Sequence, residues 1–552
     1  MRLLRKLRKR ETAFEGPPLP QLTADDPAQA LFPTTAGSWW DYQVGGATLR
    51  QTCRGHTVID EQPYVRFDGS DGETVYYLVS AERVVYCPHG ALLSRDKTAQ
   101  VAYLEAGRRP GEVWVTHGQS RVMLLAGYEN LQAAGRELPC WRVEAYNLEG
   151  DLMEQAWFAL GVGLVRKTMY TAGAELVLTD FHVAPPGDTA SLRVEADDPE
   201  VKVALGSHPT GVRVPFELTG MAPELLMVSA LAASPELALQ KMVRLEPRER
   251  AVVRFRRRWI VAGLDPEAPA DLSQAAITCL HTARGGSVWI GTLGHGLMMW
   301  DGRLWTRFDR RNSLADDYIS AVAEDAEGRL WVGTQGRGLA CLERRQDSWT
   351  WKLFHKGNSA LGDDFVRALL PTPEGLWVGT ELGGLALFRD QVAEAVPLPD
   401  GCSDGFVGDL ASSGAELLIA TNQGVYRRAG NGWESVTGSE GQRVRAVAAD
   451  HDQSVWWGTY QQGAYRLGAD GLRQFCRESA TLVNDNVWAI TPMPAGTWVG
   501  TSRGASLVEG EDVTTYGAES VLSIAQVGEQ VWVGTSRGVC VLAPRGLLEG
   551  KS

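Results

Sequence analysis

The sequence predicts an all-β protein, in which a seven-bladed β-propeller fills residues 272–552 behind a β-rich domain and a small β-sandwich. One observation is a phrase, Trp-Val-Gly-Thr, that returns at spacings of 42, 46, 41, 38, 42 and 34 residues, mostly the length of a propeller blade. Another is that most segments are short, rich in Val, Leu, Trp and Tyr, and bounded by Gly or Asp, which is typical of β-strands. The copies begin at Trp289, Trp331, Trp377, Leu418, Trp456, Trp498 and Trp532.

Each copy stands in a unit with the same order of segments. In the second unit an apolar segment (319–323) is followed by a polar turn (325–328) and then by the Trp-Val-Gly-Thr segment (331–334). A glycine-containing turn leads to a third apolar segment (339–342), and a more polar fourth segment (349–354) closes the unit. Four short antiparallel strands make one blade of a propeller. We therefore expect one blade per copy.

The residue types of the phrase suit packing between blades. A Trp in the second strand fills the wedge between neighbouring blades and can bury about 200 Å², and the following Gly lets the backbones approach closely. A single blade would expose both faces, so only a closed ring is stable. Six of the seven copies keep the Trp and six keep the Gly. At the degenerate copy, which begins at Leu418, we expect looser packing between blades.

The last unit is short of one strand. Few residues follow its third segment, which ends near Leu542. We expect the outer strand of this blade to come from residues 259–273, just before the first blade. Such a strand would lock the ring with both ends of the repeat region.

The repeat resembles the propeller repeat in the sensor regions of bacterial two-component regulators. The resemblance rests on the Trp-Val-Gly-Thr phrase and on two linkers between blades, Asn-Ser-Leu at 312–314 and Asn-Ser-Ala-Leu at 358–361. It implies a propeller that faces outside the cytoplasm and passes ligand binding on to a kinase. Because no kinase motif follows residue 535 in this sequence, we expect the signalling output to be absent or to lie on another protein.

Proline-rich stretches at 16–28, 184–188 and 265–270 divide the chain. They predict four parts: a basic tail with a linker (1–30), a β-rich domain (31–185), a β-sandwich (189–263) and the propeller (272–552).

Both upstream domains carry a family resemblance. The first resembles a β-rich domain common in bacterial lipoproteins, through Phe-Pro at 32–33, Gly-Ser-Trp-Trp-Asp-Tyr at 37–42 and the segment 157–165. Its alternating segment 74–79 predicts a strand with one face buried. The second is similar to PEGA-type modules, through turns at 198–201 and 245–249. That resemblance implies only a spacer or adhesion module.

Charge and hydropathy set limits on partners and location. The formal net charge of −13 argues against nucleic acid as a partner. No stretch approaches about 18 consecutive apolar residues, so no transmembrane segment is predicted. Six of the first ten residues are basic, without a following apolar signal core. We expect either a weak peripheral membrane contact through residues 2–10 or a solvated tail, and a cytoplasmic location by default.

The predicted binding surface is one mouth of the propeller channel, where loops converge. The turns between second and third strands and the linkers into the first strands should meet there. Acids, arginines and aromatics on these loops suit contact with a protein partner, a small ligand or a glycan; alternatively they are simply solvated turns. The predicted mouth residues are Asp317, Tyr318, Arg337, Asp364, Phe365, Phe406, Gln461, Trp488, Arg503 and Arg537.

No motif in the sequence specifies chemistry. There is no nucleophile, zinc or phosphate-binding signature, and nothing pairs His281 or His295 with an acid in the sequence. The sequence therefore predicts no catalytic residue, metal or cofactor. The leading interpretation is a non-enzymatic binding or scaffold protein that holds a protein partner at the mouth. The alternative is a ligand-sensing component that signals through a separate kinase, and the third is a carbohydrate-active or lyase-type propeller enzyme.

Overall fold

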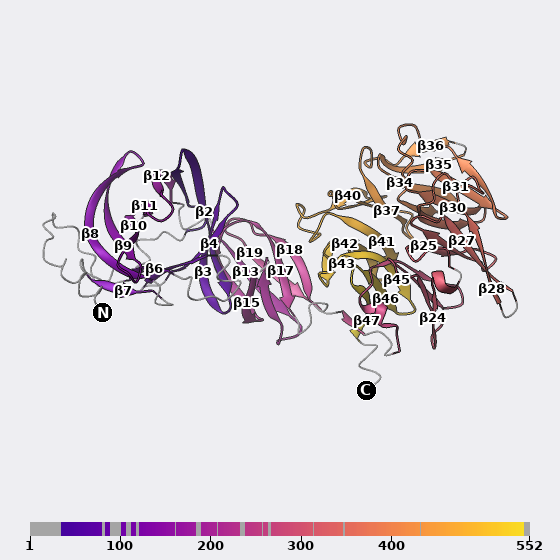
Figure 1. The fold of residues 1–552 in the computed structure, drawn as a ribbon, viewed down its shortest axis with the longest axis horizontal. Coiled ribbons are helices and arrows are strands. Elements are labelled where there is room, and N and C mark those ends of the chain that lie inside the picture. The colour runs from indigo at the N-terminus through magenta and orange to yellow at the C-terminus, as the bar shows by residue number, and fades with distance from the viewer. Residues whose placement is uncertain are drawn as a thin grey trace. The chain divides into compact units, whose positions relative to one another are not determined.

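The structure is a computed structural model, and its described residues form two compact units (Figure 1). One comprises the described residues up to 226 together with 244–254, and the other comprises the described residues of 227–243 and those from 255 onward. The expected all-β class is confirmed, since the described chain consists of strands, turns and short 3-10 helices such as η4 (Ala270–Ser273) and η5 (Arg310–Asn312). No helix in this part of the chain has the length and hydropathy of a membrane span. The described ranges are 35–79, 83–88, 101–105, 112–116, 121–159, 162–183, 189–206, 208–231, 238–256, 258–262, 267–312, 314–345, 348–430 and 432–545.

The basic tail, with its expected membrane contact through residues 2–10, lies outside the described residues.

A long antiparallel sheet dominates the first unit. Its main path runs β6-β5-β4-β3-β2-β1-β12-β11-β10-β9-β8-β7. The sheet curls so that its two edge strands come together. The indole N–H of Trp114 on β7 donates to the carbonyl oxygen of Ala102 on β6 at 2.8 Å. The strands are β1 (Trp39–Val44), β2 (Ala47–Ile59), β3 (Gln62–Gly69), β4 (Thr74–Val79), β5 (Arg83–Pro88), β6 (Val101–Glu105), β7 (Val113–Val115), β8 (Val122–Ala133), β9 (Arg136–Tyr146), β10 (Leu152–Ala159), β11 (Gly163–Met169) and β12 (Ala174–His182).

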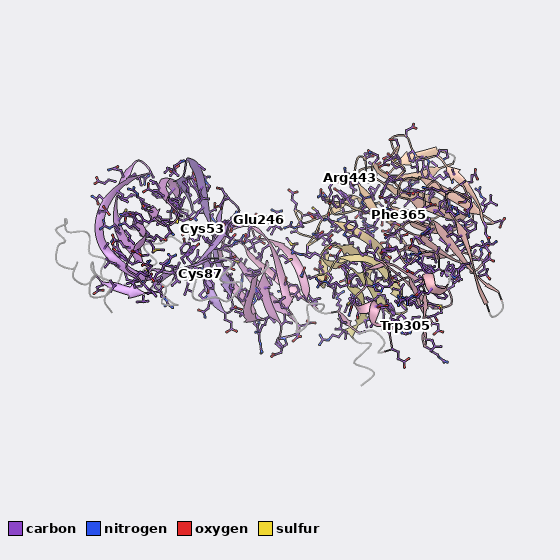
Figure 2. The ribbon with its side chains drawn as sticks, in the orientation of Figure 1. Cys53, Cys87, Glu246, Trp305, Phe365 and Arg443 are labelled. Carbon is purple, nitrogen blue, oxygen red and sulfur yellow. The ribbon has the colours of Figure 1, made fainter. Side chains whose placement is uncertain are left out.

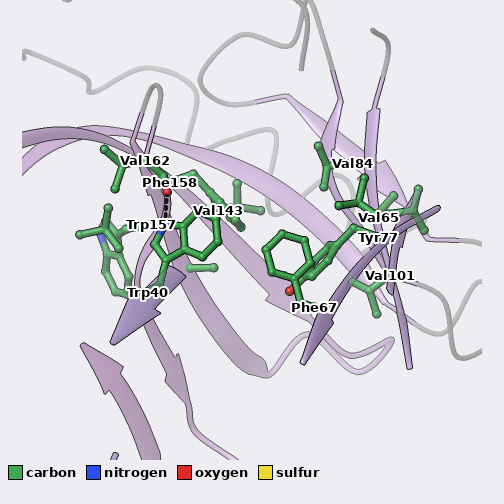
Figure 3. Packing of buried hydrophobic residues seen from close by; sticks show 14 of the residues in the cluster. Trp40, Val65, Phe67, Tyr77, Val84, Val101, Val143, Trp157, Phe158 and Val162 are labelled. Carbon is green, nitrogen blue, oxygen red and sulfur yellow. Dashed lines mark hydrogen bonds between the residues drawn. The ribbon is translucent and has the colours of Figure 1, made fainter. Parts of the chain in front are cut away.

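The curled sheet encloses an aromatic core (Figure 3). Trp40 donates its indole N–H to the carbonyl oxygen of Val162 at 2.6 Å, which joins β1 to the turn before β11. The rings of Phe67 and Tyr77 meet edge to face, with 5.3 Å between centroids. The polar atom of the buried Trp is thereby satisfied, as a large aromatic core residue requires.

The sequence predicted that residues 74–79 form a strand with one buried face. The strand is present, but both of its faces are buried. Tyr76 and Tyr77 point to opposite faces of β4, yet they are 1% and 8% exposed. Tyr77 packs in the aromatic core, whereas Tyr76 lines a pocket with Met221 and Glu224. Both faces are covered because β16 (Phe216–Met221) pairs with β2, through Met221 and Gly55.

The remaining strands of this region add to that sheet or pair beside it. β13 (Ala190–Ala196) pairs with β16 and with β19 (Arg250–Phe255). β14 (Lys202–Leu205) and β15 (His208–Arg213) form a hairpin. The lipoprotein-like and PEGA-like resemblances and the four-part division of the chain stay predictions.

The second unit contains the repeats, as six separate four-stranded sheets rather than the seven that we expected. The six sheets are β21 (Ile277–Thr282), β22 (Val288–Thr292), β23 (Leu297–Trp300) and β24 (Trp305–Phe308); β25 (Ile319–Glu324), β26 (Leu330–Thr334), β27 (Leu339–Arg345) and β28 (Ser348–Phe354); β29 (Val366–Thr372), β30 (Gly375–Thr380), β31 (Leu385–Arg389) and β32 (Val392–Val396); β33 (Asp409–Ser413), β34 (Glu416–Thr421), β35 (Gly424–Ala429) and β36 (Gly432–Ser435); β37 (Val444–Ala449), β38 (Val455–Thr459), β39 (Ala464–Gly468) and β40 (Gly471–Phe475); and β20 (Trp259–Val261) with β45 (Val521–Val527), β46 (Gln530–Thr535) and β47 (Gly538–Pro544).

The copy that begins at Trp498 explains the difference in number. Its strands β41 (Val487–Met493), β42 (Gly496–Thr501), β43 (Gly504–Glu509) and β44 (Asp512–Tyr516) pair in the usual order, but inside an eight-stranded sheet. The outer strand β44 is not a free edge, because it pairs with β18 (Leu239–Arg244) through Leu239 and Tyr516. A repeat count cannot reveal a strand added from elsewhere in the chain.

The repeats close into a propeller ring. The first strand of each repeat packs against the first strand of the next, in the order β21, β25, β29, β33, β37, β41 and β45, and β45 packs against β21. The expected upstream strand is confirmed, since β20 pairs with β47 through Trp259 with Pro544 and Val261 with Leu542.

The Trp and Gly of the phrase pack between neighbouring sheets, as the sequence predicted. The Trp of each phrase is buried, from 0% exposed at Trp498 to 4% at Trp289 and Trp532. A Cβ built on any of the six phrase glycines would come to between 2.3 and 2.8 Å from a side-chain atom at or just before the start of the next inner strand, so only Gly fits without a shift. In the degenerate copy Leu418 and Ala420 are fully buried in a cluster with Val444 and Trp457, so burial there shows no loosening.

Candidate binding site at the propeller mouth

The threonine of each phrase shapes the turn that follows it. The hydroxyl of Thr334 donates to the carbonyl oxygen of Gly338 at 2.9 Å and accepts the backbone N–H of Arg337 at 3.0 Å. The same pair of bonds recurs in all seven copies, and each threonine is at most 9% exposed. This function of the threonine was missed from the sequence, although the residue never varies in the phrase.

Backbone hydrogen bonds bring these turns beside the linkers. The N–H of Gly296 donates to the carbonyl oxygen of Asp317 at 2.9 Å, and that of Gly338 donates to the carbonyl oxygen of Asp364 at 2.8 Å. Equivalent bonds join Gly463 to Asp485 and Gly504 to Glu519. Turns and linkers therefore share one face of the ring, which is the mouth as we defined it from the sequence.

Two of the predicted acids hold their own linkers in shape. The carboxylate of Asp317 accepts the backbone N–H of Arg310 at 2.9 Å, and that of Asp364 accepts the N–H of Lys356 at 2.8 Å. Bonds of this kind stabilise the turn itself. Asp317 and Asp364 thus help to hold the linkers of the mouth in shape.

Other predicted residues present surface at the mouth. Tyr318 is 50% exposed. The indole N–H of Trp488 donates to the hydroxyl of Ser502 at 2.8 Å, and its ring centroid lies 6.4 Å from that of Tyr460. Arg537 forms an exposed ion pair with Glu519 at 3.2 Å. Arg337, Gln461 and Arg503 are exposed on the turns of this face.

The sharpest feature of the mouth is a cluster of arginines and aromatics, which we call the arginine cluster. The guanidinium of Arg367 lies over the rings of Phe365 and Phe406, with 4.9 and 5.3 Å to the centroids. The guanidinium of Arg445 lies over the Phe406 ring at 4.4 Å. Phe406 is only 3% exposed, so it acts as the floor on which two arginines stack. Phe365 is labelled in Figure 2, as is Arg443, which precedes β37.

The two arginines that stack on Phe406 differ in whether a carboxylate forms an ion pair with them. Arg367 forms an ion pair with Glu381. Arg445 makes no ion pair or hydrogen bond within the described residues, apart from its contact with the Phe406 ring. Burial lowers the pKa of Arg445 below its usual value, and the positive charges of Arg367 and Arg443 lower it further, whereas the carboxylates of Glu381 and Asp404 oppose this shift. A half-buried guanidinium without a direct ion pair is costly for the folded state.

Sequence reasoning missed Arg367 and Arg445, although a signal was present. Each follows the first apolar residue of an inner strand, Val366 or Val444, at the position that Ser320 has in β25 and Trp488 has in β41. A polar residue near the start of an apolar segment could have indicated a side chain at the channel.

One histidine lies near an acid at the same face. The Nδ1 atom of His295 is 3.6 Å from a carboxylate oxygen of Asp271, which is beyond hydrogen-bond range. That carboxylate is engaged by Arg307 at 2.7 Å. Among the described residues there is no group of three or more His, Cys, Asp or Glu side chains that could hold a metal.

Comparison with known proteins gives a short family match and distant structural likenesses. Residues 313–336 match the family described as two component regulator propeller. No match was found among curated protein sequences. The extracellular domain of BT4673 from B. thetaiotaomicron is 13% identical, with 92% of this chain and 82% of that chain covered and a TM-score of 0.41.

Two further structures cover only the propeller half. A catalytically inactive virginiamycin B lyase from Staphylococcus aureus, with quinupristin, is 13% identical over 52% of this chain and 99% of that chain, with a TM-score of 0.42. The WD40 β-propeller domain of Doa1 is 14% identical over 52% of this chain and 97% of that chain, with a TM-score of 0.41.

Proposed function

We propose that this chain is a non-enzymatic binding protein, whose seven-bladed propeller holds a protein partner at its mouth. The closed order of inner strands supports seven blades, with β41–β44 acting as the sixth blade despite the added strand β18. Propellers place their loops at the ends of a rigid ring, and such loops commonly carry binding residues.

The observation that carries the proposal is Arg445. Its guanidinium is held on Phe406 beside Arg367 and forms no direct ion pair within the described residues, although the carboxylates of Glu381 and Asp404 act on it at longer range. Arginine binds carboxylates through two parallel N–H···O bonds, and these bonds are strong where water is partly excluded. A partner with an exposed Asp or Glu would supply the missing negative charge. We therefore assign the arginine cluster to an acidic segment of the partner.

Apolar side chains around the mouth would add contact area. Leu293 is 43% exposed, Tyr318 50%, Leu382 71% and Tyr460 38%, and all four stand on turns or linkers of this face. Aromatic and arginine residues dominate the energetics of protein interfaces. The combination suits a protein surface better than a small polar ligand.

The proposal is tested with purified full-length protein and two fluorescent peptides, one of alternating Glu and Ser and one of alternating Gln and Ser. We expect the Glu peptide to bind and the Gln peptide not to bind, with affinity falling as salt is raised. Arg445→Ala should abolish the binding, whereas Arg503→Ala, an exposed arginine elsewhere on the mouth, should leave it nearly unchanged. Equal binding by both variants would rule out the arginine cluster as the site.

A second candidate function is a ligand-sensing component that signals through a separate kinase. It is favoured by the match of residues 313–336 to the two component regulator propeller family. Thermal shift of the full chain against a panel of sugars and metabolites distinguishes this function. Stabilisation by a small ligand, together with no binding of the acidic peptide, would favour the sensor.

The enzyme interpretation ranks third. The carboxylate nearest to His295 is engaged by Arg307, so the histidine lacks the positioned partner that a general base needs. A cytoplasmic location remains part of the proposal, and fractionation of cells that express the full chain tests it.

A further inference from the structure

The linkers between blades do more than connect strands, because several insert a leucine between neighbouring sheets. Leu314 is 4% exposed, Leu361 2% and Leu482 0%, and each stands in the linker that precedes an inner strand. Each belongs to a hydrophobic cluster formed by the two sheets that its linker joins. Leu272, in η4 before β21, is buried in the same way at the point where the ring closes.

The surroundings of these leucines repeat from one interface to the next. Leu482 packs between one sheet's third and fourth strands and the inner, second and third strands of the following sheet. The same cluster contains Ala464, Phe475, Val487, Val499 and Val508, together with Ala448, Trp456 and Val513. By strand register, the residues one repeat later that correspond to the first five are Ala505, Tyr516, Val521, Val533 and Leu542.

Those five corresponding residues line a pocket of about 310 Å³. It lies between β43 and β44 on one side and β46 and β47 on the other, and Ser273 and Cys540 also line it. A volume near 300 Å³ is at the lower end for ligand pockets. The interface that follows β44 thus has a pocket where the preceding interface has Leu482.

The linker length explains the pocket. Between β44 and β45 the chain has only residues 517–520, Gly-Ala-Glu-Ser, and none of the four is buried. The linker that carries Leu482 runs over 476–486. The shortest spacing between phrases, 34 residues, falls at this interface. A linker of four residues reaches β45 without a side chain to place between the sheets.

We propose that this pocket is a second binding site, which takes a leucine side chain presented by a partner peptide. The chain itself shows which group fits, since leucine occupies the corresponding place between other sheets. The ion pair of Arg537 and Glu519, at 3.2 Å, stands at the pocket and provides donors and acceptors for the peptide beside the leucine. The site is separate from the arginine cluster and does not depend on the proposed function.

The test uses the full chain and two probes, N-acetyl-leucine amide and N-acetyl-alanine amide, followed by saturation-transfer NMR and equilibrium dialysis. We expect one equivalent of the leucine probe to bind and the alanine probe to bind at least tenfold more weakly. Ala505→Leu should abolish binding without lowering the melting temperature. Its new side chain is the one that Leu297 and Leu339 already carry at this position in other sheets.

A matched variant tests the same idea in the opposite direction. Leu482→Ala should lower the melting temperature and open a second pocket, so that two equivalents of the leucine probe bind. Leu304→Ala, which removes a leucine side chain that is 65% exposed, should change neither value. Equal affinity of the wild-type chain for the two probes would overturn the proposal, and this measurement does not depend on whether the variants fold. Unchanged binding of the leucine probe by Ala505→Leu would also overturn it.

Discussion

Gly333 and Val366 mark a close approach between two neighbouring sheets: a Cβ on Gly333 would lie 2.6 Å from Cγ1 of Val366. Gly333 belongs to the second strand of one sheet and Val366 begins the inner strand of the next. Because the same approach recurs around the ring, this glycine fixes how near one blade can come to another.

Gly333→Ala should therefore destabilise the propeller through overpacking. We expect a loss of about 1–3 kcal/mol in the free energy of unfolding, measured by urea denaturation. Gly336→Ala is the matched control, because nothing lies within 4 Å of a Cβ at that turn position. A loss of equal size in both variants would contradict the packing argument.

The buried threonine caps predict a difference between two small substitutions. Thr334→Val keeps the shape but removes the hydroxyl that bonds the N–H of Arg337 and the carbonyl of Gly338, which then keeps only the backbone N–H of Thr334 as its donor. A single hydrogen bond contributes about 0.5–1.5 kcal/mol, so we expect a loss of that size together with faster amide exchange at Arg337. Thr334→Ser retains the hydroxyl and should lose less. If Val and Ser behaved alike, the cap would not be the stabilising element.

The closing strand can be tested by crosslinking. Ile260 on β20 and Ala543 on β47 are paired residues of adjacent antiparallel strands. Such pairs have Cα atoms about 4.5–5.5 Å apart, a separation that a disulfide can bridge. The double variant Ile260→Cys with Ala543→Cys should form a disulfide under mild oxidation, detected by mass spectrometry. The out-of-register pair Ile260→Cys with Val541→Cys should crosslink poorly.

Asp409 predicts a pH dependence of stability. Burial raises the pKa of its carboxyl from 3.8 to about 6, although hydrogen bonds from the N–H groups of Val447 and Leu410 oppose the rise. The folded state therefore favours protonated Asp409, so its stabilising contribution is complete below pH about 4 and is lost as the pH rises through about 6. The loss is at most roughly 3 kcal/mol, since the residue keeps partial exposure. Asp409→Asn should flatten the dependence in urea denaturation between these pH values.

Asp452 is the control with the opposite sign. Hydrogen bonds from Ser454, and then from Arg466, lower the pKa of its carboxyl to about 2. Its contribution is present above pH about 4 and is lost as the pH falls toward 2. Asp452→Asn should thus leave the range between pH 4 and 6 unchanged. If Asp452→Asn flattened the pH dependence of the free energy of unfolding in that range and Asp409→Asn did not, the dependence could not be attributed to Asp409.

The sequence predicted the propeller well because the repeat encodes local contacts. The Trp and Gly of the phrase meet the neighbouring sheet in six of the seven copies, so similar environments leave similar segments in the sequence. The closing strand was also predictable, since the last unit lacked a fourth strand. Pairing of β18 with β44 was not, because it joins segments distant in the sequence and leaves no periodic pattern.

The binding site, too, was predictable from the sequence only in part. The loops that form the mouth follow from strand order, but the arginine cluster depends on how three successive blades bring Phe406 between Arg367 and Arg445. Each arginine looks like an ordinary surface residue in its own unit. Their proximity becomes visible only when the ring brings the inner strands together.

Closure by β20 also sets an order of events during synthesis. The ribosome makes β20 before any blade of the ring and makes its partner β47 last. At about 5–20 residues per second, the two strands are separated by a delay on the order of tens of seconds. During that time β20 is an unpaired strand of three residues, short enough to limit pairing with other chains. The nascent chain can therefore add blades one by one, but the ring becomes a single cooperative body only when its final strand leaves the exit tunnel.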